Sequence, residues 1–181
     1  MNRKEAYDLV ARTVGNKNLV KHMLAAEACM RRIARARSQD EDLWGMAGLL
    51  HDLDYDRTAD DFPRHGFTTA EMLVPLGVDD RILDAIKAHP GHIDRTTDLA
   101  KALYAVDPLT GLIVAATLMH PTKKIQNVDA EFVLRRFREK RFAAGANRDQ
   151  IETCSELGLG LEPFIALCLE AMQAIAADLG L

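Results

Sequence analysis

Six histidines are the residues of this chain best suited to chemistry, because imidazole is a common metal ligand and an acid or base near neutral pH. They are His22, His51, His65, His89, His92 and His120. His22, His51 and His89 each stand three, four or seven positions from apolar residues, so they share predicted helical faces with the core. A buried imidazole left without partners costs about 1–3 kcal/mol. Convergence of these rings on a cation would meet that need, and separately hydrogen-bonded core histidines are the alternative.

Two aspartates could complete such a site. Asp52 directly follows His51 at the end of an apolar stretch, where a polar and acidic segment begins. Adjacent residues on a helix point about 100° apart, so this pair can hold one ion only at a helix end or bend. Gly45 and Gly48 lie on the Asp52 side of the stretch and leave room for a neighbouring helix. Asp107 lies on an apolar face, where a bound cation would balance its charge. The alternative is that Asp107 is a helix N-cap, because a proline follows it.

The elements that must position these residues are predicted to be helices. Apolar residues recur at helical spacing through nearly the whole chain, and no stretch alternates as a strand would. We expect an all-α fold with about eight or nine helices in a single domain over residues 1–181. The expected helices are 3–14, 19–37, 43–52, 67–76, 79–89, 98–120, 129–141, 147–157 and 161–179. A loop is expected at 52–64, a capping box at 68–71 and an N-cap at Asp79.

Composition narrows the class of protein. The chain has 181 residues, of which 48% are hydrophobic and 28% charged, and these values are typical of a globular protein. The longest apolar run, 111–119, is far shorter than the roughly 20 residues of a membrane helix, and no secretory signal is visible. Three cysteines without a CxxC motif fit reduced thiols, and a net charge of -4 gives no general attraction to nucleic acid. We therefore expect a cytoplasmic protein with no membrane partner.

The ordered set H…HD…H…H…D resembles the HD superfamily of metal-dependent phosphohydrolases. The matching stretches are LVKHMLAAE, GLLHDLDYD, PRHGFTTAEML, AIKAHPGH and ALYAVDPLTGL, which together span roughly residues 19–119. LLHDLDYD, LYAVDPLTGLI and the later KKI and FAAGANR stretches are also similar to a group of short, stand-alone predicted HD hydrolases. The resemblance implies an HD-type helical bundle with a metal-site core at about 19–119 and the helices of 129–179 packed on it.

The resemblance also implies roles for particular residues. The four ligands of the primary metal would be His22, His51, Asp52 and Asp107. His65 and His89 match the additional ligands of members with two metals, in which Asp52 would bridge the ions. This ligand set suits Mn, Fe, Co, Ni or Zn, and Mg less well. A bound ion makes hydroxide available as the nucleophile, and the expected reaction is cleavage of a phosphomonoester or phosphodiester, with a nucleotide as the favoured substrate. For His65 a surface position is the alternative, and for His89 a helix C-cap.

A phosphate substrate also requires positive charge near the metal. The candidates for substrate binding are Arg57, Arg64, His92, Lys123, Lys124 and Arg148. Lys123 and Lys124 are favoured, because the resemblance extends to them, and either could neutralise the charge that develops in the reaction. Solvated surface charge is the alternative for each basic residue. Residues 123–141 have a local net charge of +4 but lack the interleaved aromatics of a nucleic-acid platform, so we expect no specific nucleic-acid partner.

Two other functions use the same residues. Some HD-superfamily proteins hold two irons and activate dioxygen, and the ligand set fits that chemistry equally well. A non-catalytic module that binds a metal and a nucleotide is the third hypothesis. The sequence predicts neither the substrate, nor the native metal, nor the oligomeric state.

Overall fold

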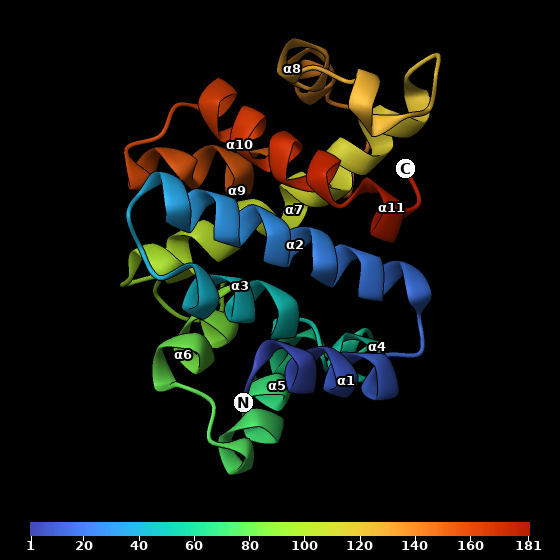
Figure 1. Cartoon of the computed structure of the whole chain (residues 1–181). Helices are drawn as coiled ribbons and strands as arrows, with labels where there is room; N and C mark the ends of the chain where they lie inside the picture. The colour runs from blue at the N-terminus through green and yellow to red at the C-terminus, as the bar shows by residue number, and fades with distance from the viewer.

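Helices form every regular element of the chain, as the periodicity predicted (Figure 1). The computed structural model describes all residues from Met1 to Leu181. In chain order the α-helices are α1 (Arg3–Thr13), α2 (Lys17–Ala36), α3 (Glu41–Leu50), α4 (Tyr55–Thr58), α5 (Phe67–Leu73), α6 (Asp80–Ala88), α7 (Asp98–Met119), α8 (Ala130–Arg138), α9 (Arg148–Glu152), α10 (Leu161–Ala174) and α11 (Ala176–Leu179). The short 3-10 segments are η1 (Phe62–Arg64), η2 (Val74–Leu76), η3 (Ile125–Asn127) and η4 (Thr153–Leu157).

The chain has more α-helices than the eight or nine expected, for two local reasons. The stretch at 52–64 was expected to be a loop, but it contains the single turn α4 and the 3-10 segment η1. The last expected helix divides at Ile175 into α10 and α11. Two of the other expected helices, 67–76 and 147–157, finish as the 3-10 segments η2 and η4, and the rest are present with ends shifted by a few residues. The all-α prediction is confirmed.

The starts of α5 and α6 show one wrong and one confirmed prediction. Asp79 caps α6 with its side chain, as expected. The capping box expected at 68–71 is wrong, because α5 begins directly after Gly66 and no side chain of its own caps it. Asp54 caps α5 instead: its Oδ2 accepts hydrogen bonds of 2.9 Å from the N–H groups of Gly66 and Thr69. A carboxylate 12 to 15 residues earlier in the chain therefore fixes the start of this helix.

The helix α7 continues through its proline. Its N-cap is Thr97, so Asp107 lies in the interior of the helix, and the N-cap alternative for that residue is wrong. A proline has no N–H group, so Pro108 leaves the carbonyl of Tyr104, four residues earlier, without its helical donor. The side-chain Nε2 of Gln150 in α9 donates to that carbonyl at 2.8 Å. A residue of the C-terminal region thus compensates for the proline beside Asp107.

By length and composition, α7 could also cross a membrane, and the bent pair formed by residues 148–157 and α10 passes the same test together. The shorter apolar run at 111–119 did not predict this. More than half of the apolar window of α7 is buried in the bundle, and the core helix of a globular protein has the same composition. The burial of α7 therefore accounts for its apolar character.

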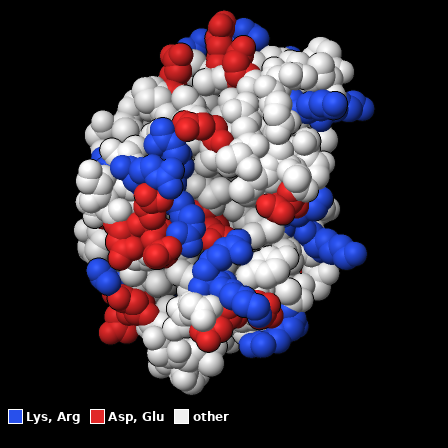
Figure 2. All heavy atoms as spheres, in the orientation of Figure 1, with Lys and Arg blue, Asp and Glu red and all other residues white.

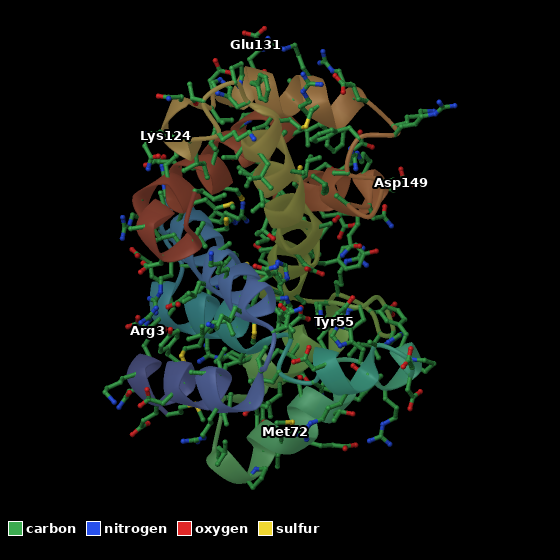
Figure 3. The ribbon with its side chains drawn as sticks, turned by 90° about the vertical axis from the view of Figure 1, so that its right-hand side faces the viewer. Arg3, Tyr55, Met72, Lys124, Glu131 and Asp149 are labelled. Atoms are coloured by element: carbon green, nitrogen blue, oxygen red, sulfur yellow. The ribbon has the colours of Figure 1, made fainter.

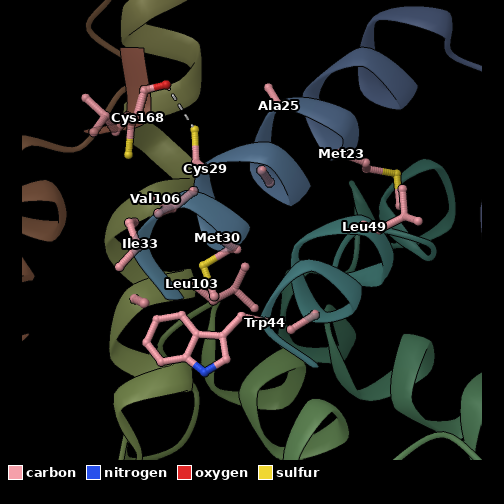
Figure 4. Packing of buried hydrophobic residues seen from close by; sticks show 14 of the residues in the cluster. Met23, Ala25, Cys29, Met30, Ile33, Trp44, Leu49, Leu103, Val106 and Cys168 are labelled. Atoms are coloured by element: carbon pink, nitrogen blue, oxygen red, sulfur yellow. Dashed lines mark hydrogen bonds between the residues drawn. The ribbon is translucent and has the colours of Figure 1, made fainter. Parts of the chain in front are cut away.

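The helices α2, α3 and α7 pack around a common core. In Figure 1, α2 crosses the middle of the molecule, with α1, α3 and α6 on one side and α9 and α10 on the other. Gly48 allows α3 to approach α2 closely, since a Cβ there would lie 2.7 Å from the backbone carbonyl of Ala26. Figure 4 shows Met30, Trp44 and Leu103 buried between these helices. This packing holds the end of α3, and the residues that follow it, against α2 and α7.

Basic and acidic side chains are mixed on the face shown in Figure 2. The arginines of α2 illustrate this, because each has an acidic partner. Arg31 pairs with Asp42 at 2.7 Å, and Arg35 pairs with Glu41 at 2.7 Å. These ion pairs favour the interpretation of the α2 arginines as a solvated surface rather than a polyanion site.

Candidate metal centre

The six predicted ligands come together from five parts of the chain. His22 lies in the second turn of α2, and Asp107 lies in the middle of α7. The 51–52 pair follows the last residue of α3, so both side chains project from a helix end, as the 100° argument required. Two further histidines complete the cluster from the turn before α5 and the end of α6; they are His65 and His89.

One group of donor atoms forms around His22. Its Nε2 lies 3.1 Å from Asp107 Oδ1 and 3.2 Å from His51 Nε2. The same Asp107 oxygen is 3.8 Å from His51 Nε2. One atom from each of these three residues lies within 4.8 Å of the others, which is close enough to share an ion. The structure thus brings three of the four expected primary ligands to one point.

Asp52 lies between this group and a second pair of histidines. Its Oδ2 is 3.5 Å from His22 Nε2, and its Oδ1 is 3.4 Å from His51 Nε2. The same Oδ1 lies 3.3 Å from His65 Nε2 and 3.4 Å from His89 Nε2. A carboxylate in this position can contact an ion on each side. The geometry therefore suits the bridging role that the resemblance implies for Asp52.

Backbone carbonyls fix the orientation of two imidazole rings. His51 Nδ1 is 2.8 Å from the carbonyl oxygen of Gly48, and His89 Nδ1 is 2.6 Å from that of Ile86. A carbonyl can only accept, so both Nδ1 atoms must donate a proton. The Nε2 atom of each neutral ring is then left as a lone pair that points into the cluster. This arrangement is typical of metal-binding histidines.

Side chains fix the other two rings in the same way. Asp54 Oδ1 accepts from His65 Nδ1 at 2.8 Å. The hydroxyl of Thr110 donates to the carbonyl of Asp107 at 2.9 Å, so its oxygen is free to accept from His22 Nδ1, also at 2.9 Å. The sequence-based prediction included neither Asp54 nor Thr110. The only sequence signals were the second aspartate in HDLD and a threonine one helical turn after Asp107.

Four imidazole lone pairs therefore face one another inside the protein. The Nε2 atoms of His22 and His51 are 3.2 Å apart, and those of His65 and His89 are 3.0 Å apart. Two lone pairs at such distances repel unless a proton or a cation lies between them. Nitrogen and carboxylate donors together suit Mn, Fe, Co, Ni or Zn better than Mg. The donor set thus fits one or two divalent ions.

The charges of the metal-free cluster support this interpretation. Burial disfavours the charged form of His51, but Asp52 and Asp107 outweigh it and raise its pKa to about 9. His65 is also buried, and Asp52 and Asp54 raise its pKa to about 9. Burial opposes ionisation of Asp52 and Asp107 as well, yet the neighbouring histidines hold the pKa of both carboxyls below its usual range. The cluster therefore attracts positive charge, and without a metal ion protons supply it.

The cluster opens into a cavity of about 420 Å³, which is large enough for a small ligand. Residues that the sequence did not mark as part of the site line it together with the ligands. These are Leu19, Tyr55, Phe62, Pro90, Pro108, Gly145, Asn147 and Gln150. Tyr55 and Phe62 come from the segment that was expected to be a loop, and the last three come from the C-terminal region. Nothing in their spacing marked them as cavity residues.

The structure does not bring the expected lysines to this cavity. Lys123 and Lys124 follow the C-terminal end of α7 and are absent from the cavity lining. A helix rises 1.5 Å per residue, so the end of α7 at Met119 lies about 18 Å along the axis from Asp107. Figure 3 likewise shows Lys124 far from Tyr55, near the end of the molecule that carries α8. The length of α7 thus separates the favoured lysines from the site.

The other expected phosphate contacts also lie outside the cavity lining. Arg57 is exposed on α4, and Arg64 is exposed and pairs with Glu71 at 3.0 Å. Arg148 donates to backbone carbonyls of the preceding segment, including that of Ala143 at 2.7 Å, and so holds the segment before α9 in place. His92 Nε2 donates to the carbonyl of Phe62 at 2.9 Å and supports the wall of the cavity from behind. Arg64, Arg148 and His92 therefore have structural partners in place of a ligand, and Arg57 points to solvent.

Comparison with known proteins agrees with the geometry. A model of the HD domain family matches residues 19–116, more than half of the chain. Over 100 residues the chain is 29% identical to Ribonuclease Y 2 of Levilactobacillus brevis, a match that covers 55% of this chain and 19% of that protein. The match thus spans about a fifth of the relative's length. No solved structure matches the chain. On the match of the family model and the cluster of histidines and aspartates, the chain belongs to the HD domain family.

Proposed function

We propose that this protein is a metal-dependent phosphohydrolase that cleaves a phosphomonoester or phosphodiester of a small molecule. Membership of the HD family and the similarity to Ribonuclease Y 2 support phosphohydrolysis in general. The observation that carries the proposal is the convergence of four imidazole Nε2 atoms on Asp52, with each Nδ1 held by a separate hydrogen-bond acceptor. A core with a purely structural role would not require its histidines to converge in this way.

The ligand assignment follows from the two groups of donor atoms. His22, His51 and Asp107 would hold one ion, His65 and His89 a second, and Asp52 would contact both. A divalent cation held there lowers the pKa of a bound water toward neutrality and polarises phosphoryl oxygens. The chain supplies the geometry for this chemistry, because the four acceptors at Nδ1 keep each ring oriented with its Nε2 atom toward the ion site.

Exposure of the ligands indicates the side from which a substrate approaches. The side chains of His22 and Asp107 are 24% and 27% exposed, whereas that of His51 is fully buried. His89 and Asp52 are also buried, at 1% and 7%. A phosphate ester would therefore reach the cluster from the cavity beside His22 and Asp107. The buried ligands on the other side exclude bulk water and strengthen the local electrostatic field.

Metal analysis followed by an activity screen tests the proposal. The purified protein should contain one or two transition-metal ions per chain and hydrolyse at least one member of a panel of phosphate esters with Mn, Co, Ni or Mg added. His51→Ala should lose the metal and at least 100-fold in kcat/KM, since it removes a central ligand. His120→Ala is the matched control, because that histidine bonds to Thr122 away from the cluster.

The alternative functions give different results in the same experiments. Bound iron with oxygen uptake on addition of a substrate would favour the di-iron oxygenase. Tight nucleotide binding without turnover would favour the non-catalytic module. Metal-loaded protein that hydrolyses no ester in the panel, or unchanged turnover in His51→Ala, would overturn the proposal.

A further inference from the structure

The two exposed aromatic side chains of the chain both line the metal-site cavity. Tyr55 is 45% exposed and Phe62 is 52% exposed, whereas every other aromatic residue is buried or half-buried. Both rings lie against the metal-site histidine His65, with ring centroids 5.4 Å and 5.7 Å from it. Apolar surface left open at the wall of a ligand cavity is available to pack against a bound molecule. Two aromatic rings beside the cluster therefore favour a ligand that carries a planar group.

Neighbouring residues hold Phe62 in this position. Its carbonyl accepts the hydrogen bond from His92, and its ring lies 5.1 Å from the His92 ring. His92 in turn stacks on Phe67 at the start of α5, with the rings 5.8 Å apart and inclined by 13°. The aromatic wall is thus built on a helix that Asp54 caps, and a ligand would find it already formed. A preformed surface binds at lower entropic cost than one that must be ordered.

The cavity lining contains no lysine or arginine. Its charged residues are Asp52 and Asp107, beside the histidines. The charge of a bound phosphate must then be balanced by the metal ions alone. Two divalent ions would carry four positive charges against three carboxylates, those of Asp52, Asp54 and Asp107, which leaves a net charge of +1 to offset a bound phosphate. Each further phosphate would add negative charge that no lysine or arginine of the lining offsets.

We propose that the site selects esters that carry a single phosphate and a planar aromatic group, with Tyr55 and Phe62 as the residues that determine this specificity. The inference rests on the proposed phosphohydrolase function and narrows its substrate class. Polyphosphate esters and nucleic-acid strands are poor substrates on this proposal, and small alkyl phosphates are weaker ligands than aryl phosphates.

Binding of non-hydrolysable phosphonates to the metal-loaded protein tests the aromatic preference without turnover. Calorimetry should give a dissociation constant for phenylphosphonate about tenfold lower than for methylphosphonate, as expected for one stacked ring. Phe62→Leu and Tyr55→Leu should each raise the constant for phenylphosphonate several-fold and leave that for methylphosphonate unchanged. Phe62→Tyr keeps a ring at the same position and serves as the matched control, with binding close to wild type.

Turnover tests the charge argument. With metal in excess, kcat/KM for a nucleoside monophosphate should exceed that for the triphosphate at least tenfold. Gly145 lines the cavity and has no atom within 4 Å of the position of a Cβ, so Gly145→Lys adds a cation without a clash. This variant should reduce the preference for the monophosphate several-fold. Gly160→Lys, with only ordinary contacts to Pro163 and a position outside the cavity, is the charge-matched control.

The outcomes separate this inference from the function on which it rests. Equal binding of the two phosphonates, or triphosphate or RNA hydrolysis as fast as that of the monophosphate, would overturn the inference and leave phosphohydrolysis intact. A metal-loaded protein that turns over no ester would overturn the proposed function, and the phosphonate measurements would still decide whether the aromatic wall selects a ring.

Discussion

Asp54 fixes the tautomer of His65 through a hydrogen bond that is buried from solvent. Its Oδ2 accepts from two backbone N–H groups and its Oδ1 accepts from His65 Nδ1. In Asp54→Asn, the amide oxygen would accept from the backbone N–H groups, so the NH₂ group would face His65. Because NH₂ can only donate, His65 Nδ1 would have to accept, and the ring proton would move to Nε2. We expect affinity for the second metal ion to fall about 10- to 100-fold. Metal titration by calorimetry and the metal content per chain measure the loss.

The first metal group should remain intact in that variant, since His22 and His51 have other acceptors. Asp61→Asn is a suitable control, because it changes an exposed carboxylate of the same segment that lines no part of the cavity. Unchanged affinity for both ions in Asp54→Asn would contradict the tautomer argument.

The sequence predicted six residues that the structure brings together, but it did not predict the residues that hold them in place. His22, the 51–52 pair and Asp107 stood out because polar groups on apolar faces need partners, and the family resemblance ordered them. The acceptors Asp54 and Thr110 were not predicted, since their partners are set by which helices meet in space. Lys123 and Lys124 were favoured because the resemblance extends to them, but the length of a helix decides whether a charge reaches a site. The distance along α7 therefore keeps both lysines away from the site, although the resemblance extends to them.

Gly48 sets the distance between α3 and α2 and thereby the position of the histidine that follows α3. In Gly48→Ala, a methyl group 2.7 Å from the backbone of Ala26 forces the two helices apart. We expect the free energy of unfolding to fall by about 1–3 kcal/mol, as for other overpacked cores. Urea unfolding followed by circular dichroism measures it. Gly111→Ala is the matched control: its Cβ meets no atom, so helix propensity should raise stability by about 0.5–1 kcal/mol.

Asp79 caps α6, the helix whose other end delivers His89 to the site. Hydrogen bonds from Arg81 to the Asp79 carboxylate lower its pKa to about 2 from the ordinary 3.8. A lowered pKa stabilises the fold above the unfolded value, so this contribution is present above about pH 4 and is lost as the pH falls through 2. At pH 7, Asp79→Ala should cost about 1 kcal/mol of unfolding free energy. The difference from wild type should shrink between pH 4 and 2, and a constant difference would contradict the ionic cap.

Element prediction succeeded where periodicity is local and failed where a distant residue intervenes. The long helices could be predicted because the spacing of their own apolar residues defines them. The start of α5 was misread because its cap, Asp54, comes from another segment. The interior position of Asp107 was left open because Pro108 alone favours a helix start, and the donor that permits continuation is Gln150 in α9. Such long-range hydrogen bonds leave no periodic signal in a sequence.

The sequence suggested a metal-site core with C-terminal helices packed on it, but the packing of the molecule crosses the boundary between these two parts. One cluster of buried apolar residues extends from Ala6 to Leu179. Cys29 in α2 donates to the carbonyl of Cys168 in α10, as Figure 4 shows, and both thiols are buried. The C-terminal region also supplies Gly145 and Gln150 to the cavity. We therefore treat residues 1–181 as one proposed unit, in which the later helices support the site directly.

Metal binding should stabilise the whole molecule, because one cluster joins α2 and α7 to the ends of α3 and α6 and to the turn before α5. A ligand at a free concentration of 100 times its dissociation constant adds about 2.7 kcal/mol to the unfolding free energy of the folded form that binds it. For a chain of this size that corresponds to a change in Tm of about 5–10 °C. Chelation should therefore lower the Tm by this amount, and Mn or Co should restore it. In His51→Ala the chelator should have little effect, whereas an equal shift in that variant would place the stabilising ion elsewhere in the fold.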